Sequence, residues 1–192
     1  MKICKSKKEF EEAVSPEVNA KNTLKIGAKY TTNQAKDILT LADNYAKQKS
    51  TCKKTAVGCY LVNEQAYRTV AAKGCNNAEV SCKDEGCLRE QTFGDNSKEH
   101  RSVCRCYGNH AEQDALRKLR EKSDRFVGTL SAFVTRYPCD ECARELIGAG
   151  VKLVVYGREF KISEVAAKAF EDAGVEVVHL ADWNCDENDT NN

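Results

Sequence analysis

Apolar residues follow two kinds of pattern along this chain. In four stretches they recur at helical spacing, which predicts amphipathic helices. These stretches are 32–48, 110–122, 139–149 and 163–173. In five shorter stretches they form compact runs, which predict buried strands. These runs are 56–62, 68–72, 129–135, 151–155 and 175–180.

The connections suggest how the strands pair. Asn63-Glu64-Gln65 is a short turn, so the first two strands are expected to form a hairpin. The last two strands flank a helix, so they are expected to be joined by a parallel crossover. Thr32 and Asn33 are candidate caps for the first helix, and Pro138 suits the first turn of the third helix. The pattern as a whole predicts an α/β domain.

Composition narrows the class of protein. The chain has 192 residues, 41% of them hydrophobic and 31% charged, which fits one globular domain with a real core. The net charge of +1 gives no basic field for a nucleic-acid backbone and favours a small substrate. No apolar run is long enough to cross a membrane. The start Met1-Lys2-Ile3-Cys4 does not read as a secretory signal, so we expect a cytoplasmic protein.

Cysteine usage is unusual for such a protein. The chain has eleven cysteines, and in a reducing compartment they favour metal binding over disulfides. Residues 74–108 show no convincing periodicity but contain five of them, Cys75, Cys82, Cys87, Cys104 and Cys106. A loop of this length in a compact domain needs its own organising principle, and a metal is the obvious candidate.

Two short motifs carry the clearest chemistry. His110-Ala111-Glu112 and Pro138-Cys139-Asp140-Glu141-Cys142 supply one histidine and two cysteines, which are good zinc ligands. Alone, the first motif is usually the start of a surface helix, and the second can be redox-active, structural or accidental. Together, in this order, they form the signature of zinc-dependent nucleobase deaminases. Three protein ligands leave a fourth position for water, as in catalytic zinc sites.

The expected mechanism divides the work between metal and carboxylate. Zinc lowers the pKa of its water to about 7, so hydroxide is available to attack C4 of cytosine. Both motifs lie at helix starts, whose positive ends stabilise thiolates. Glu112 is the catalytic residue, because it can take the water proton, protonate N3 and help ammonia leave. The alternative is that Glu112 only complements the helix dipole.

The order of elements and several motifs within residues 32–180 resemble the cytidine deaminase-like family, and within it the deoxycytidylate (dCMP) deaminases. The matching motifs are Ala56-Val57-Gly58, Gly74-Cys75-Asn76-Asn77, Glu99-His100-Arg101-Ser102, His110-Ala111-Glu112-Gln113 and Pro138-Cys139-Asp140-Glu141-Cys142-Ala143. The resemblance implies a three-layer α/β/α fold with a five-stranded mixed sheet. It also implies hydrolysis of dCMP to dUMP for thymidylate synthesis, a zinc cofactor and a homo-oligomer.

The resemblance also divides the chain and shows departures. We expect an N-terminal extension over 1–30, the deaminase domain over 31–181 and an acidic tail over 182–192. The family often has Gly-Tyr-Asn-Gly where this chain has Gly74-Cys75-Asn76-Asn77. That region binds an allosteric deoxynucleoside triphosphate in regulated members, so the departure speaks against such control here. Asp114 replaces a frequent asparagine, which we expect to be a minor change.

Substrate contacts are predicted mainly from the resemblance. Asn76 matches the family asparagine that hydrogen-bonds the nucleoside, although a turn asparagine is common. Tyr156 and Phe160 stand where the family places aromatic residues near the nucleotide, and Tyr156 can equally be a core residue. Arginine suits phosphate recognition, and each candidate can also be an ordinary surface residue. The candidates for the 5′-phosphate are Arg101, Arg105 and Arg136.

Other functions stay open at this point. A related enzyme would act on another nucleoside, nucleotide or modified base, although the near-neutral charge disfavours tRNA. A protein of a different class would be a non-catalytic zinc module that binds a partner through its cysteine loop. Glu112 discriminates between these classes, because a scaffold does not need a carboxylate beside an open zinc site.

A second, structural zinc is expected in the long loop. Phage-type dCMP deaminases carry one, and this chain resembles them in having Cys52 before the first strand and His100 in the loop motif. His100 and Cys104 would share a face of a helical turn. The fourth ligand is Cys87 or Cys82, with Cys106 a further contender, and we take the set Cys52, Cys87, His100 and Cys104. The alternative is that these are free thiols.

Overall fold

The computed structural model describes residues 25–26, 30–65, 69–94, 101–122, 128–158, 162–181 and 183. Its strands are β1 (Lys25–Ile26), β2 (Tyr30–Thr31), β3 (Gly58–Asn63), β4 (Thr69–Cys75), β5 (Leu130–Arg136), β6 (Val151–Arg158) and β7 (Glu176–His179). Its helices are α2 (Thr32–Lys49), α3 (Cys82–Glu85), α4 (Leu88–Phe93), the 3-10 turn η2 (Arg101–Val103), α5 (Ala111–Lys122), α6 (Asp140–Gly148) and α7 (Glu164–Asp172).

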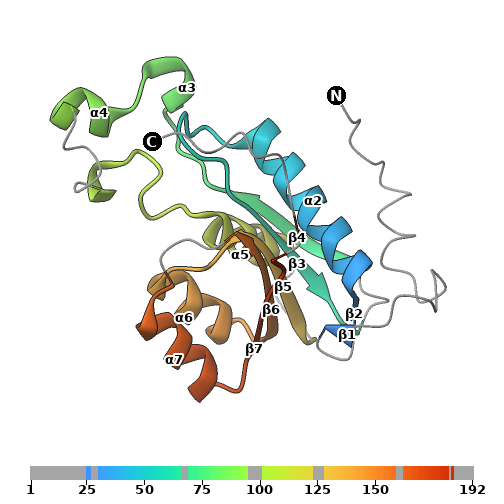
Figure 1. Ribbon diagram of the computed structural model, residues 1–192. Coiled ribbons are helices and arrows are strands. Elements are labelled where there is room, and N and C mark those ends of the chain that lie inside the picture. The colour runs from blue at the N-terminus through green and yellow to red at the C-terminus, as the bar shows by residue number, and fades with distance from the viewer. Residues whose placement is uncertain are drawn as a thin grey trace.

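The main sheet has five strands in the order β4-β3-β5-β6-β7. β3 runs antiparallel to both β4 and β5, whereas β5, β6 and β7 are mutually parallel. The predicted hairpin, the parallel pairing of the last strands and the mixed five-stranded sheet are therefore confirmed. Helix α2 covers one face, and α5, α6 and α7 cover the other (Figure 1). The result is the predicted α/β/α sandwich.

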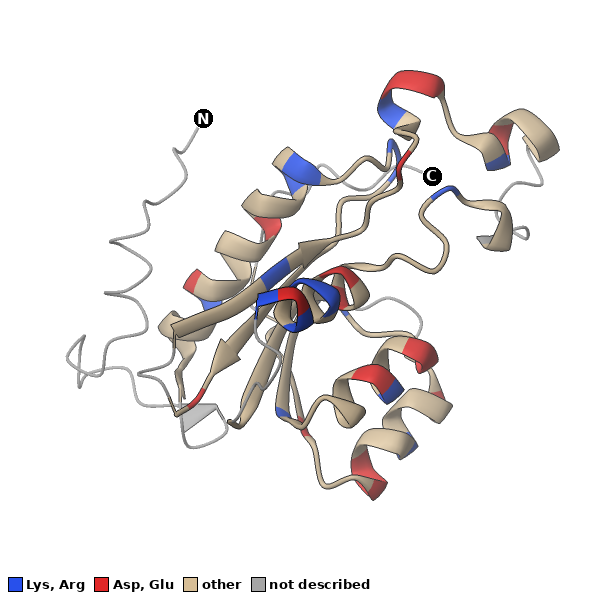
Figure 2. Cartoon of the chain, turned by 180° about the vertical axis from the view of Figure 1, so that it is seen from behind, with Lys and Arg blue, Asp and Glu red and all other residues tan. Residues whose placement is uncertain are grey.

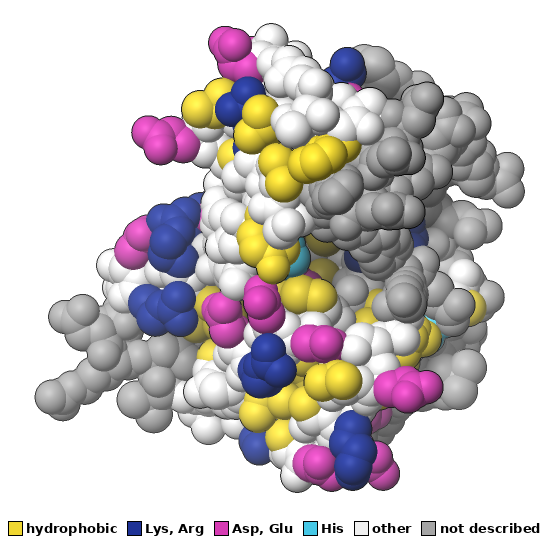
Figure 3. Space-filling view, turned by 90° about the vertical axis from the view of Figure 1, so that its left-hand side faces the viewer, with side chains coloured by type: hydrophobic (Ala, Val, Ile, Leu, Met, Phe, Trp, Pro, Cys, Tyr) yellow, Lys and Arg dark blue, Asp and Glu magenta, His cyan; other side chains and the backbone are white. Residues whose placement is uncertain are grey.

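The central strands are buried on both faces, which explains their continuous apolar runs. In β3, Cys59 and Leu61 face the core beneath α5, while Tyr60 and Val62 face the core beneath α2. Lys, Arg, Asp and Glu gather on the helices and loops and are sparse on the strands (Figure 2). On the face shown in Figure 3, side chains of both signs alternate. This surface supports the prediction that no single-sign field covers the molecule.

Two glycines bring helices close to the sheet. A Cβ at Gly58 would collide with the carbonyl oxygen of Ala42 in α2. A Cβ at Gly74 would collide with the backbone of Ala111 and Ala115 in α5. Gly74 lies near the end of β4, beside the first turn of α5. This close packing fixes the position of the helix start that follows His110.

The N-terminal cap of α2 differs from the prediction by one residue. Thr31 is the cap, and its hydroxyl accepts the Gln34 amide while the Gln34 side chain accepts the Thr31 amide. This reciprocal arrangement is a capping box, which Thr32 and Asn33 cannot form. Tyr30 lies just before it and is almost fully buried, and its ring centre is 5.0 Å from that of Phe133 in an edge-to-face arrangement.

The region predicted to lack regular structure contains α3, α4 and η2 instead. Helices of four and six residues are too short to show a period, so the sequence pattern could not reveal them. Strand β6 also continues to Arg158, beyond the predicted end at residue 155. The division at residues 30 and 182 stays a prediction, since most of both end segments lies outside the described residues.

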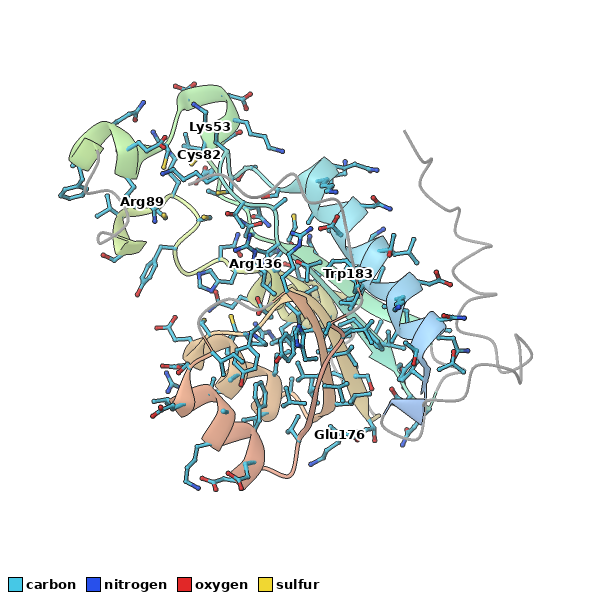
Figure 4. The ribbon with its side chains drawn as sticks, viewed as in Figure 1. Lys53, Cys82, Arg89, Arg136, Glu176 and Trp183 are labelled. Carbon is cyan, nitrogen blue, oxygen red and sulfur yellow. The ribbon has the colours of Figure 1, made fainter. Side chains whose placement is uncertain are left out.

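Trp183 closes the α2 face of the sheet. It is 5% exposed, its indole N–H donates to the Thr40 hydroxyl over 3.1 Å, and its ring lies against Gly157, where any Cβ would collide with it. Figure 4 shows it beside α2.

Among the described helices, none is long and apolar enough to cross a membrane.

Candidate metal centre

His110 reaches the site from the residue immediately before α5. Its backbone carbonyl accepts the Asp114 amide, so it occupies the cap position of the helix. The apolar side chains of Ala115, Leu116 and Leu119 hold α5 against the sheet. Packing of the helix thus aims its N-terminus, with its positive end, at the site.

The two cysteines come from the link between β5 and α6. Cys139 is the N-terminal cap of α6, and Cys142 lies in its first turn. Pro138 precedes this cap, so it does not occupy the first turn of the helix as predicted. Its missing N–H fits a position just before the helix equally well. Two helix N-termini therefore converge on one point, as the motifs predicted.

The geometry fits a tetrahedral zinc ion. His110 Nδ1 lies 3.4 Å from Cys139 Sγ and 3.5 Å from Cys142 Sγ, and all three donor atoms lie within 4.8 Å of one another. Zinc bonds of about 2.3 Å to sulfur and about 2.0 Å to nitrogen hold such atoms about 3.5 Å apart. Cys142 is buried and His110 is half-buried, whereas Cys139 is exposed.

Hydrogen bonds among the three donor side chains shift their pKa values. The Cys142 thiol donates to Cys139, and this contact lowers the pKa of Cys139 to about 4. The same contact, with burial, raises the pKa of Cys142. A hydrogen bond with Cys139 raises the pKa of His110. A divalent metal can replace these shared protons, because thiolate and neutral imidazole are the forms that bind metal.

Glu112 lies beside the donors but is not one of the three. Its side chain is 4% exposed, and burial raises its pKa to about 7. It is hydrogen-bonded to the Cys142 sulfur. A carboxyl group that titrates near neutral pH can both accept and donate a proton, which is what a general acid–base needs. Among the described residues, the site therefore combines three candidate metal donors with a buried carboxyl group.

Comparison with known proteins identifies the family. Residues 32–158 match the model of the family described as the cytidine and deoxycytidylate deaminase zinc-binding region. The chain belongs to this family. The match contains all four residues of the site, His110, Glu112, Cys139 and Cys142.

Several relatives of this deaminase family are similar in sequence. ComE operon protein 2 of Bacillus subtilis is 32% identical over 129 residues, covering 67% of this chain and 62% of that protein. The deoxycytidylate deaminase of Saccharomyces cerevisiae is 29% identical over 132 residues, covering 69% of this chain and 40% of that protein. The chain thus spans less than two thirds of the length of these relatives.

A solved structure is similar over nearly its whole length. The dCMP deaminase of the cyanophage S-TIM5, in complex with dCMP and dUMP, is 26% identical with a TM-score of 0.54. The match covers 74% of this chain and 93% of that chain. Its fold supports the layer order described above for this member of the deaminase family.

Asp114, the departure from the usual asparagine, has a larger structural role than predicted. It is fully buried, and its oxygens accept the Cys75 amide over 3.1 Å and the Lys118 and Arg117 side chains over 2.6 Å each. Burial alone would raise the pKa of this carboxyl, but the hydrogen bonds lower it overall. The ionised form therefore ties the end of β4 to α5.

The side chain of Asn76 forms hydrogen bonds within the protein. Its Oδ1 accepts the Ser50 hydroxyl over 2.9 Å and the Val57 amide over 2.8 Å, and its Nδ2 donates to the Thr55 carbonyl over 2.9 Å. These bonds shape the loop that precedes β3. Within the described part of the chain Nδ2 has one acceptor, Thr55, and the predicted substrate contact stays a proposal.

Asn109 joins the same region to the metal site and escaped the sequence prediction. Its Nδ2 donates to both oxygens of Asn77, 3.0 Å from the carbonyl and 2.5 Å from Oδ1. Asn77 follows Asn76, and Asn109 precedes His110. The repeated asparagines beside two predicted motifs were the only signal in the sequence.

The other predicted substrate residues have different positions. Tyr156 is 6% exposed, stacks on His179 with ring centres 4.6 Å apart and meets Tyr137 edge-on, so its interpretation as a core residue fits. Arg136 is half-buried at the end of β5 (Figure 4). Arg105 is half-buried between two loop cysteines. Phe160 and the side chain of Arg101 lie outside the described residues.

Cysteines from three segments interact with one another: Cys52 before β3, Cys82 and Cys87 beside α3 and α4, and Cys104 and Cys106 after η2. Cys52 is hydrogen-bonded to Cys106, which lowers the pKa of Cys52 to about 5, and it accepts the backbone N–H groups of Lys54 and Thr55. Burial raises the pKa of Cys82 and of Cys104, and the nearby Cys52 and Cys87 raise both pKa values further. Figure 4 shows Cys82 and Arg89 in this segment.

This cysteine cluster is looser than the first site. Among the described residues, the His110 site is the one group of donors that all lie within 4.8 Å of one another. His100, one of the predicted ligands, lies outside the described residues. The clustering fits the predicted second site, while its ligand set and its occupancy stay predictions.

Proposed function

We propose that this protein is a zinc-dependent hydrolase that converts dCMP and water into dUMP and ammonia. The arrangement of His110, Cys139 and Cys142 around an open fourth position, with buried Glu112 beside it, carries this proposal. A structural zinc site would be closed by a fourth ligand and would not need a buried carboxyl group next to it.

The chemistry of the site supports deamination. Zinc held by the three donors would act as a Lewis acid and lower the pKa of water. Glu112, with a pKa near 7, can hold a proton taken from water and deliver it to N3 of the cytosine ring. The Glu112 carboxylate would then take the proton of the new C4 hydroxyl group and deliver it to the C4 amino group, so that the C–N bond breaks and ammonia leaves.

The relatives favour dCMP among the cytosine compounds. Both the yeast protein and the cyanophage protein are named as deaminases of this nucleotide, and the cyanophage structure contains dCMP and dUMP. The cyanophage chain is matched over 93% of its length, so its whole fold corresponds to the deaminase domain proposed here.

A lysine-rich hollow offers a place for a phosphate group. The hollow, of about 190 Å³, lies between the end of α2, the loop before β3 and α3. Its cations are Lys47, Lys53, Lys54 and Lys83, and its one acid is Asp43. Lys47 is paired with Asp43 and Lys54 with Glu90, so Lys53 and Lys83 are the candidates to contact a phosphate. Its wall includes Thr55 and Ala56, the loop that Asn76 holds. We propose that this hollow, rather than the predicted arginines, receives the 5′-phosphate.

A substrate panel tests the substrate and the hollow together. We expect a higher kcat/KM for dCMP than for deoxycytidine, dCTP or cytosine, measured as ammonia release. A hydrogen bond to a charged group contributes about 1.5–3 kcal/mol, so Lys53→Ala/Lys83→Ala should raise KM for dCMP about tenfold or more. The rate with deoxycytidine should stay as it was.

The control for this experiment is Lys168→Ala, since Lys168 lies on the exposed surface of α7. Equal kcat/KM for dCMP and deoxycytidine would overturn the choice of dCMP and favour a nucleoside or modified base. Ammonia release from none of the four compounds would favour the non-catalytic zinc module.

We also propose a second, structural zinc in the cysteine cluster. Two backbone N–H groups point at the Cys52 sulfur, an environment that stabilises thiolate. The small helices α3 and α4 contribute few buried side chains, so metal binding would replace a missing apolar core. We keep Cys52, Cys87, His100 and Cys104 as the proposed ligands, with Cys82 and Cys106 as alternatives.

Elemental analysis of protein purified without added metal tests the second site. We expect two zinc ions per chain, falling to one in Cys52→Ser/Cys104→Ser. His110→Ala should remove the other ion, so that the two sites are counted separately. One zinc ion per chain in the unaltered protein would reject the second site.

That the protein acts in the cytoplasm and as a homo-oligomer stays a prediction.

A further inference from the structure

One side chain joins the two halves of the metal centre. The Oε1 atom of Gln113, in the first turn of α5, accepts the backbone N–H of His110 over 3.0 Å. Its Nε2 atom donates to Glu145 Oε1 on α6 over 2.8 Å. His110 is a metal donor, and Glu145 lies one turn after the donor Cys142. A single amide thus connects helices that each carry part of the site.

The link is independent of the donors' own side chains. Among the described residues, the other side-chain hydrogen bonds between the two halves of the site join His110 to Cys139 and Cys142, and Glu112 to Cys142. Those contacts belong to the metal site itself and change when a metal binds. The bond from Gln113 to Glu145 is compatible with either state, so it can hold the two helices in position before binding.

The link uses both the oxygen acceptor and the nitrogen donor of the Gln113 side-chain amide. A carboxylate at position 113 could still accept the His110 N–H, because glutamate at this helix position commonly does so. It would also suit the positive end of the helix. It could not donate to Glu145, however, and would place two carboxylates against each other. The requirement for glutamine therefore comes from α6 and not from the stability of α5.

We propose that Gln113 and Glu145 are positioning residues for the zinc site, which hold the His110 half and the Cys142 half at binding distance. This inference rests on the proposed zinc function and adds residues outside the ligand set. Outer partners that fix metal ligands commonly contribute 10–100-fold to metal affinity. Their effect here should appear in zinc retention rather than in the proton transfers of Glu112.

The test compares Gln113→Glu, Glu145→Gln and the double variant. We measure zinc loss to a chromophoric chelator in the full chain. In Gln113→Glu, repulsion between the two carboxylates should speed zinc loss by about tenfold or more. Glu145→Gln should have a small effect, since its amide oxygen can still accept from Gln113. In the double variant the new amide can donate to the new carboxylate, so retention should return close to that of the unaltered protein.

Two further measurements distinguish an effect on the position of the zinc ligands from an effect on the stability of the fold. Thermal unfolding of the zinc-free Gln113→Glu protein should be nearly unchanged, because α5 keeps its cap. Glu171→Gln, on the exposed face of α7, is the matched control and should leave zinc loss unaltered. Equal zinc loss in all variants, or no rescue in the double variant, would overturn the inference while leaving the proposed function intact. Unaltered protein that binds no zinc would instead overturn the proposed function.

Discussion

Glu112→Gln should lose nearly all conversion of dCMP while the protein keeps its fold and its zinc. The amide has the size of the carboxyl group but cannot take up and release a proton. Proton transfer by a placed side chain contributes typically about 10²–10⁴-fold, and here one residue serves several transfers, so we expect kcat to fall by about 10³-fold or more. The rate of dUMP formation and the zinc content are measured on the same preparation.

A neighbouring carboxylate provides the matched control. Glu141→Gln changes an exposed residue in the first turn of α6, between the two cysteines, and should keep most activity. Near-normal turnover of Glu112→Gln with bound zinc would remove Glu112 from the proposed mechanism. Loss of zinc in this variant would mean that the residue belongs to the ligand set.

His110→Ala should lose both the zinc of this site and the activity. Without His110 only the two thiolates of Cys139 and Cys142 are left, which are too few donors to hold a zinc ion in this site. We expect one zinc ion less per chain by elemental analysis and no measurable dUMP. The loss of metal distinguishes this variant from Glu112→Gln, which fails with zinc still bound.

The control for His110→Ala is another histidine. His179 stacks on Tyr156 at the end of β7 and is not one of the three donors, so His179→Ala should keep its zinc. An unchanged zinc content in His110→Ala would contradict the ligand role. In that case the cysteines would bind metal without the histidine, and the open catalytic site would be the wrong description.

The sheet could be predicted mainly because its central strands β3, β5 and β6 are largely buried and appear as apolar runs. The strand ends were less exact, since β6 continues through Gly157 and Arg158 beyond its most apolar part. The short helices α3 and α4 left no period in the sequence. The cap of α2 is Thr31, one residue before the prediction, and the spacing of Thr31 and Gln34 is the capping-box signal that the prediction missed.

The metal donors could be predicted because their spacing within each motif reflects one turn at a helix start. Contacts between distant segments were beyond the sequence. Gln113 meets Glu145 only because α5 and α6 converge, and the hydrogen bonds of Asn76 depend on how the loop before β3 folds. The lysine hollow likewise gathers residues from α2, a loop and α3, and no local pattern marks it.

Titration of zinc-free protein with zinc, while dUMP formation from dCMP is measured, tests the central claim most directly. We expect activity to rise with zinc and to level off when the site of His110, Cys139 and Cys142 is filled. Glu112→Gln titrated in parallel should bind the same zinc and form almost no dUMP. Failure of the zinc-loaded, unaltered protein to convert dCMP to dUMP, at any zinc content, would contradict the account.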